Sequence, residues 1–214
     1  MCQRHHGGYI WPMKRGVACL IAVAVMLGGA AYATAAESTG LAPQGAASMV
    51  ETRAAQPPNG WIRREVPNWI FWAPNRQWVA THNKNGIDVS SPTGDIVVSY
   101  GWTSWGYELS TRDAIDIIFS PSSTPDFTRL RITKWGKVTG PPGNQRQTVM
   151  WTGIRRHPLK GNQSVRGVTE VNVFVAGFGA YGFSAKGYMA PVNQWKSSVK
   201  TMRTIVRFIT FLPS

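Results

Sequence analysis

Cysteine and acidic residues are both scarce in this chain of 214 residues. Cys2 and Cys19 are its two cysteines, so the chain beyond Cys19 can form neither an internal disulfide nor a thiolate metal site. Its stability must come from core burial. Ten Asp and Glu stand against 23 Lys and Arg, for a formal net charge of +13, and no acidic residue follows Glu170. This balance favours acidic partners or surfaces.

The N-terminal residues have the pattern of a secretory signal peptide. Lys14 and Arg15 precede the apolar run GVACLIAVAVMLGGAAYATAA, which ends in small residues. Because Ala33 and Ala35 fit a cleavage pattern, we expect residues 1–36 to be removed and the protein to be secreted or periplasmic. The alternative is an uncleaved membrane anchor.

The remaining chain divides by composition into a tether and one domain. Residues 37–59 are rich in Ala, Pro, Gly, Ser and Thr, which predicts a flexible tether. Residues 60–214 have the length of a single domain and contain every tryptophan beyond Trp11. Burial of several of these rings is expected to supply the core.

The first part of the domain alternates short apolar runs with turn residues, which predicts strands. Asn85-Gly86 is a hairpin signal, and the Ser-Pro-Thr-Gly-Asp sequence at 91–95 predicts a turn that leads into another strand. Ser110 or Thr111 ahead of Asp113 predicts a capped helix, which Pro121 ends.

The second part predicts four strands and a terminal helix. The strand candidates are FTRLRITKWGKV, RQTVMWTGIRR, VTEVNVFVAG and YGFSAKGYMA. In VNQWKSSVKTMRTIVRFI, large apolar residues recur at steps of four and three, as on one face of a helix. These residues are Trp195, Val199, Met202, Val206 and Ile209. The order of elements predicts an α+β domain with an antiparallel sheet covered by helices.

A glycine pattern at Gly177, Gly179 and Gly182 has the G-x-G-x-x-G spacing of a dinucleotide-binding loop. The residues after Gly182 alternate like a strand instead of opening a helix. The acidic residue that would bind a ribose hydroxyl is missing. We therefore expect a hairpin at this position and no nucleotide cofactor.

The stretches GIDVSSPTGDIVVSYG and AYGFSAKGYMAPVNQWKSSVKTMRTIVRFI resemble the PsbP-like superfamily, named for an extrinsic subunit of the photosynthetic oxygen-evolving complex. The resemblance covers about residues 60–211 and implies an α-β-α sandwich, often exported by bacteria. Functions in this superfamily range from photosystem accessory to nuclear-transport partner, so the resemblance implies a fold and a non-catalytic role. The chain departs from the pattern in its final TFLPS and its dense early tryptophans, and no functional residue carries over.

Residues for catalysis or metal binding are few. His82 and His157 are the only histidines beyond residue 36, and neither has a metal-spaced neighbour. Ser184 does not fit a nucleophile elbow. A hydrolase acting through carboxylates near Asp88 and Asp113 stays open as the alternative function, since two such groups facing each other across a cleft could cleave an envelope polymer.

Two sets of residues are candidates for binding. Trp102, Trp105 and Tyr107 offer flat rings for a sugar or an apolar partner, if they are not part of the core. The second set combines a basic edge of the terminal helix with three cations of the preceding strands, as a docking surface for an anionic polymer or membrane. Its members are Lys196, Lys200, Arg203, Arg207, Arg155, Arg156 and Lys160.

The sequence thus favours a secreted, non-catalytic binding or accessory module acting at the cell envelope. The expected partner is an anionic polymer, a membrane surface or another protein. Nucleic acid is not expected, because charge alone supports it and export conflicts with it.

Overall fold

The structure is a computed structural model that describes residues 56–105, 107–175 and 180–212. The expected signal peptide and residues 37–55 of the expected tether lie outside these ranges. The elements are β1 (Ile62–Val66), β2 (Trp69–Ala73), β3 (Val79–Asn83), β4 (Gly86–Ser90), β5 (Val97–Trp105), α2 (Thr111–Ile118), β6 (Phe127–Trp135), β7 (Asn144–His157), β8 (Gly161–Val175), β9 (Tyr181–Pro191), the 3-10 turn η3 (Val192–Gln194), α3 (Trp195–Arg207) and β10 (Thr210–Phe211).

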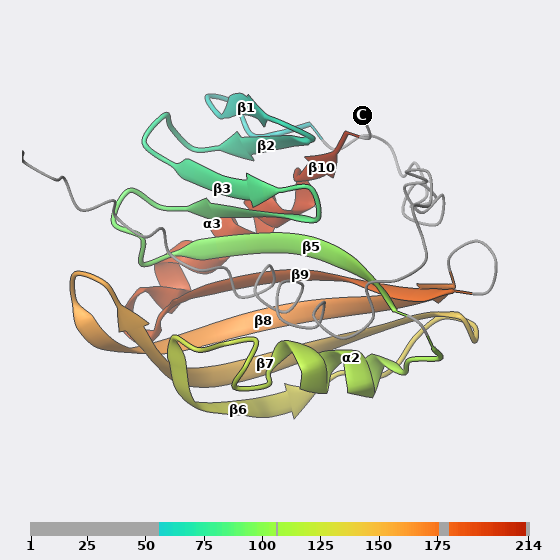
Figure 1. Ribbon diagram of the computed structural model, residues 1–214. Helices are drawn as coiled ribbons and strands as arrows, with labels where there is room; N and C mark the ends of the chain where they lie inside the picture. The colour runs from blue at the N-terminus through green and yellow to red at the C-terminus, as the bar shows by residue number, and fades with distance from the viewer. Residues whose placement is uncertain (1–55, 106, 176–179, 213–214) are drawn as a thin grey trace, which may run out of the picture.

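Seven strands form one antiparallel sheet in the order β3-β4-β5-β9-β8-β7-β6, and β1, β2 and β10 form a small second sheet. Figure 1 shows α2 and α3 on opposite sides of the large sheet. The α+β class with a helix-covered antiparallel sheet is therefore confirmed.

The hairpins follow the turn signals closely. β3 and β4 pair Asn83 with Gly86, so the two turn residues are Lys84 and Asn85, one position before the predicted pair. β8 and β9 pair antiparallel as far as Val175 and Tyr181, which confirms a hairpin in place of a dinucleotide-binding helix. Gly177 and Gly179 themselves lie outside the described residues.

Both predicted helices form. The Ser110 hydroxyl accepts from the Asp113 amide and the Asp113 carboxylate accepts from the Ser110 amide, which completes a capping box at the start of α2. α3 turns its apolar side to the sheet: Met202 of the predicted stripe and the adjacent Ile205 are fully buried, whereas Trp195, Val199 and Val206 of the stripe are half-buried. Five strands, more than the sequence resolved, precede α2, because the early apolar runs fold into two separate sheets.

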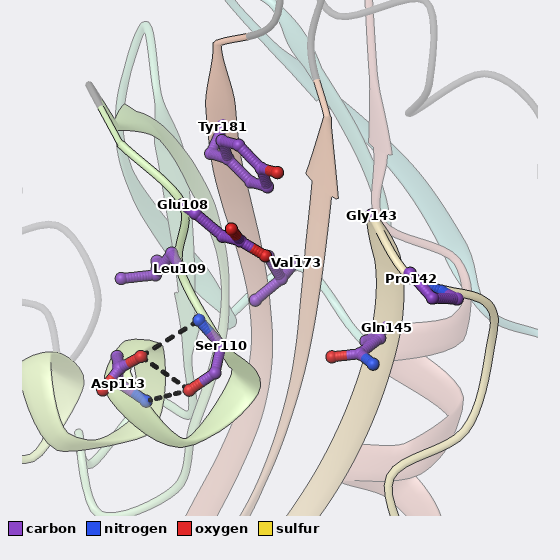
Figure 2. A pocket seen from close by; sticks show the side chains of 9 residues that line it. All are labelled: Glu108, Leu109, Ser110, Asp113, Pro142, Gly143, Gln145, Val173 and Tyr181. Atoms are coloured by element: carbon purple, nitrogen blue, oxygen red, sulfur yellow. Dashed lines mark hydrogen bonds between the residues drawn. The ribbon is translucent and has the colours of Figure 1, made fainter.

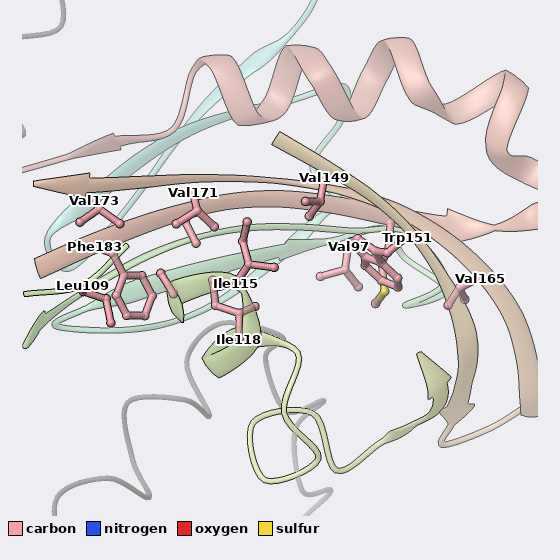
Figure 3. Close-up of a cluster of buried hydrophobic side chains, with 13 residues drawn as sticks. Val97, Leu109, Ile115, Ile118, Val149, Trp151, Val165, Val171, Val173 and Phe183 are labelled. Atoms are coloured by element: carbon pink, nitrogen blue, oxygen red, sulfur yellow. The ribbon is translucent and has the colours of Figure 1, made fainter. Parts of the chain in front are cut away.

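Two apolar clusters hold the layers together. The first lies between the large sheet and α2, and Figure 3 shows Ile115 and Ile118 of the helix against valines of the strands and Trp151. The second lies between the other side of the sheet, α3 and the small sheet, and includes Trp69 and Phe71. Alternation along each strand sends successive side chains to opposite clusters. Whether a residue holds an odd or an even position in its strand therefore decides which face of the sheet its side chain occupies.

In the part of the chain that the structure describes, no helix has the length and hydropathy of a membrane span.

Candidate functional site

The outer edge of α3 is a row of exposed cations. Lys196, Lys200, Arg203 and Arg207 are all exposed, as the helical spacing predicts. Lys200, Arg203 and Arg207 line an open pocket of about 340 Å³, together with Gln56 and Pro58 ahead of β1 and with other residues of α3. We call the four cations the helix edge.

Among the residues that the structure describes, the helix edge has no acidic partner. None of its cations takes part in the salt bridges of the described residues, and α3 contains no Asp or Glu. Arg203 donates from Nε to the Tyr188 hydroxyl at 3.1 Å, and this hydrogen bond raises the pKa of Arg203. Its charge is thereby held near the sheet while the other three cations remain free to contact a ligand. An uncompensated row of this kind attracts anions.

The prediction that three strand cations belong to the docking surface needs correction. Arg155 is 2% exposed, and its Nη1 donates to the Gly94 carbonyl at 2.8 Å, so it is not available to a partner. Lys160 is exposed, but its ammonium group pairs with the Asp95 carboxylate, so its charge is compensated. Arg156 is exposed, because it points to the opposite face of β7 from Arg155, and it takes part in no salt bridge of the described residues.

Arg155 and Lys160 belong to a buried polar cluster beneath the turn at 91–95. His157 Nδ1 accepts from the amides of Leu159 and Lys160, so Nε2 carries the proton and donates to the Thr93 carbonyl at 3.1 Å. Thus the cluster ties the β4–β5 turn to the β7–β8 hairpin. Its role is structural.

Asp95 is the anion at the centre of this cluster. Burial by itself raises the pKa of the Asp95 carboxyl. Hydrogen bonds from Lys160, Gln163 and Thr93 outweigh burial, however, and hold this pKa below its ordinary value of 3.8. The folded state therefore favours the carboxylate over the protonated acid.

We expect this lowered pKa to appear in the acid stability of the fold. A depressed pKa means that the stabilisation is present above about pH 4 and is lost as the pH falls through the folded pKa. Asp95→Asn should lower the melting temperature at neutral pH. It should also make the melting temperature fall less steeply as the pH is lowered. Thermal unfolding followed by circular dichroism between neutral pH and pH 2 measures both effects. Asp116→Asn, which removes an exposed carboxylate paired with Arg112, is the control; equal acid profiles for both variants would contradict the assignment.

The predicted aromatic surface does not form. Trp102 packs with the second cluster against Phe211, with ring centroids 6.2 Å apart. Trp105 packs with the first cluster, on the opposite side of β5. Trp102 and Trp105 are three positions apart along the strand, and an odd number of positions places side chains on opposite faces. Only Tyr107 is largely exposed, with its ring against Trp105.

A second pocket of about 400 Å³ lies where the start of α2 faces the ends of β7, β8 and β9. Figure 2 shows Tyr181 and Val173 from the sheet on one side and the capped turn of α2 on the other. Its carboxylates are Glu108 and Asp113. Hydrogen bonds from the Ser110 side chain and then from its backbone hold the pKa of Asp113 below its ordinary value. Asp113 is therefore an ionised cap, poorly suited to donate a proton.

The structure also locates the other carboxylate of the hydrolase hypothesis. Asp88 is 4% exposed within β4 and is not among the residues that line the pocket containing Asp113. Asp88 and Asp113 thus do not face each other across this pocket, which the glycosidase arrangement would require. In the described residues, no group of three or more His, Cys, Asp or Glu residues could hold a metal ion.

No family model and no curated protein matches this sequence. Some solved structures, however, are similar to this chain. The solution structure of cyanobacterial PsbP (CyanoP) from Synechocystis sp. PCC 6803 is similar over 71% of this chain and 92% of its own, with 9% identity and a TM-score of 0.45. The crystal structure of LpqN, involved in cell envelope biogenesis of Mycobacterium tuberculosis, is similar over 74% of this chain and 82% of its own, with 11% identity and a TM-score of 0.41.

Proposed function

We propose that this protein is a secreted, non-catalytic accessory module that docks on an anionic polymer of the cell envelope through the helix edge of α3. The observation that supports this function is the uncompensated row of four exposed cations, three of which line one pocket. The wider charge balance agrees, because the chain carries 23 basic and ten acidic residues. Export rests on the signal-peptide pattern of residues 1–36.

Attraction between exposed charges weakens as salt shortens the Debye length from about 10 Å at 0.1 M to about 3 Å at 1 M. The protein should therefore bind polygalacturonate, a linear carboxylated polysaccharide, at low ionic strength and lose most of that binding near 1 M salt. Dextran, a neutral polysaccharide, should not bind at either concentration. Titrations followed by tryptophan fluorescence measure all four combinations.

Salt-independent binding, or equal binding of dextran, would show that charge does not drive the interaction. Binding to phosphatidylglycerol vesicles without binding to polygalacturonate would identify a membrane surface as the partner instead. Release of reducing ends from the polymer would favour the hydrolase alternative.

A further inference from the structure

Part of the large sheet on the α3 side lies beyond the helix. α3 packs mainly on β9 and β5, whereas β8, β7 and β6 continue the sheet past them. On this side, the outward side chains of β7 from Arg146 to Arg156 are half-buried or exposed, in contrast to their buried neighbours on the α2 side. A broad strand surface is therefore left beside the helix.

Five cations share this surface, as register and alternation show. Arg131 of β6 is paired with Thr152 of β7, and its Nε lies 3.4 Å from the Thr152 hydroxyl oxygen. Lys134 is paired with Met150, which lies on the same face of β7 as Thr152. Two further arginines stand near the ends of β7, and one stands on β8. We call the five residues the strand-face cluster: Arg131, Lys134, Arg146, Arg156 and Arg166.

The strand-face cluster is as poorly compensated as the helix edge. Its cations are absent from the salt bridges of the described residues. Among the described strand residues that register places on this face, Glu170 is the one carboxylate, and it is cross-strand from Lys186. Burial lowers the pKa of Lys186, the Glu170 carboxylate raises it, and repulsion from the nearby Arg146 lowers it again.

The two basic surfaces meet at the start of α3. The guanidinium carbon of Arg166 lies 5.3 Å from the centroid of the Trp195 ring, which stacks on Tyr188 at 5.9 Å. The Tyr188 hydroxyl accepts the hydrogen bond from Arg203 of the helix edge. Contacts therefore run from the strand-face cluster to the helix edge through two aromatic rings, without an intervening acid.

We propose that a single linear acidic polysaccharide binds across both surfaces, with its chain passing from the helix edge of α3 onto the strand-face cluster. This proposal rests on the proposed function and adds the strand face as a second contact region. Charge complementarity to repeated carboxylates supports it. Thr148, Thr152 and Asn172, which lie between the cations on the same face, offer hydrogen bonds to sugar hydroxyls.

The shape of the two surfaces favours a chain over a flat partner. A helix packed on a sheet has a diameter of about 10 Å with its side chains, so a membrane resting on the outer side of α3 would be held away from the strands. A flexible polysaccharide chain can pass from the outer side of the helix down to the strands. Single-stranded nucleic acid would need exposed rings for base stacking, whereas Trp195, the ring at the junction, is already covered by Tyr188 and Arg166.

The test uses a pair of substitutions on the strand face and a matched pair elsewhere. Lys134→Gln/Arg146→Gln removes two exposed charges from the cluster, and Arg76→Gln/Lys84→Gln removes two exposed charges near the β3 strand. The strand-face pair should weaken polygalacturonate binding about tenfold at low ionic strength, and the control pair much less.

The outcomes separate this proposal from the proposed function. If the strand-face variant binds the polymer like wild type while a helix-edge variant does not, the strand face has no role and the function stands. If the strand-face variant and the helix-edge variant both bind the polymer like wild type, the strand-face proposal and the proposed function are both wrong. If the strand-face variant loses as much affinity for phosphatidylglycerol vesicles as for the polymer, the partner is a membrane surface and not a polysaccharide. Lys134→Gln/Arg156→Gln, a second pair from the cluster, provides the same test if the first variant is poorly folded.

Discussion

Replacing Lys196, Lys200, Arg203 and Arg207 by Gln is expected to weaken polygalacturonate binding roughly a hundredfold at low ionic strength. Each cation near an anionic surface contributes about 1 kcal/mol, and neighbouring cations screened by solvent contribute less than this sum. The four side chains are exposed, so the substitutions should leave the melting temperature close to that of wild type. Titration of both proteins at two salt concentrations measures the effect.

A variant with Arg63, Arg76, Lys84 and Arg112 replaced by Gln is the control, because it removes the same number of charges from β1, the β2–β3 and β3–β4 connections, and α2. It should lose far less affinity than the helix-edge variant. Equal losses would mean that net charge, and not the helix edge, governs binding.

Trp151→Ala is expected to cost about 3 to 5 kcal/mol of folding free energy. Trp151 is 1% exposed, and its ring packs edge-on against Phe119 and Phe127 in the first cluster. Its Nε1 donates to the Thr169 hydroxyl at 3.1 Å, so the substitution leaves both a cavity and a buried hydroxyl without its donor. Urea unfolding measures the loss.

Gly167 shows how tightly the Trp151 ring is held, since a Cβ at Gly167 would lie 2.2 Å from a ring carbon of Trp151. Gly167→Ala should therefore also destabilise the fold. Leu159→Ala is the surface control, because Leu159 is 86% exposed. If Trp151→Ala unfolds at the same urea concentration as Leu159→Ala, the first cluster does not hold the fold as described.

Local signals were sufficient for the two helices and for the helix edge. The period of four and three residues in the last segment predicts both α3 and the side on which its cations lie, since helix geometry alone sets the angle between them. The capping box at Ser110 and Asp113 is likewise a local pattern. Such features need no knowledge of distant strands.

Features that depend on strand parity were harder to predict. Arg155 and Arg156 are neighbours in sequence, yet one is buried and the other exposed. Val149 and Trp151 mark the buried face of β7, and their odd numbers would have placed Arg155 on it. The same rule separates Trp102 from Trp105. The strand-face cluster required the pairing of β6, β7 and β8, which joins residues far apart in the chain.

Lysine footprinting tests the docking account most directly, because it reads the contact surface of the unaltered protein. The protein is acylated with and without polygalacturonate at low ionic strength, and modification of each lysine is quantified by mass spectrometry. Lys196, Lys200 and Lys134 should become protected, while Lys84, exposed near the opposite edge of the large sheet, should react as before. Equal protection of Lys84 and Lys196, or no protection of Lys196 and Lys200 with the polymer bound, would contradict docking through the helix edge.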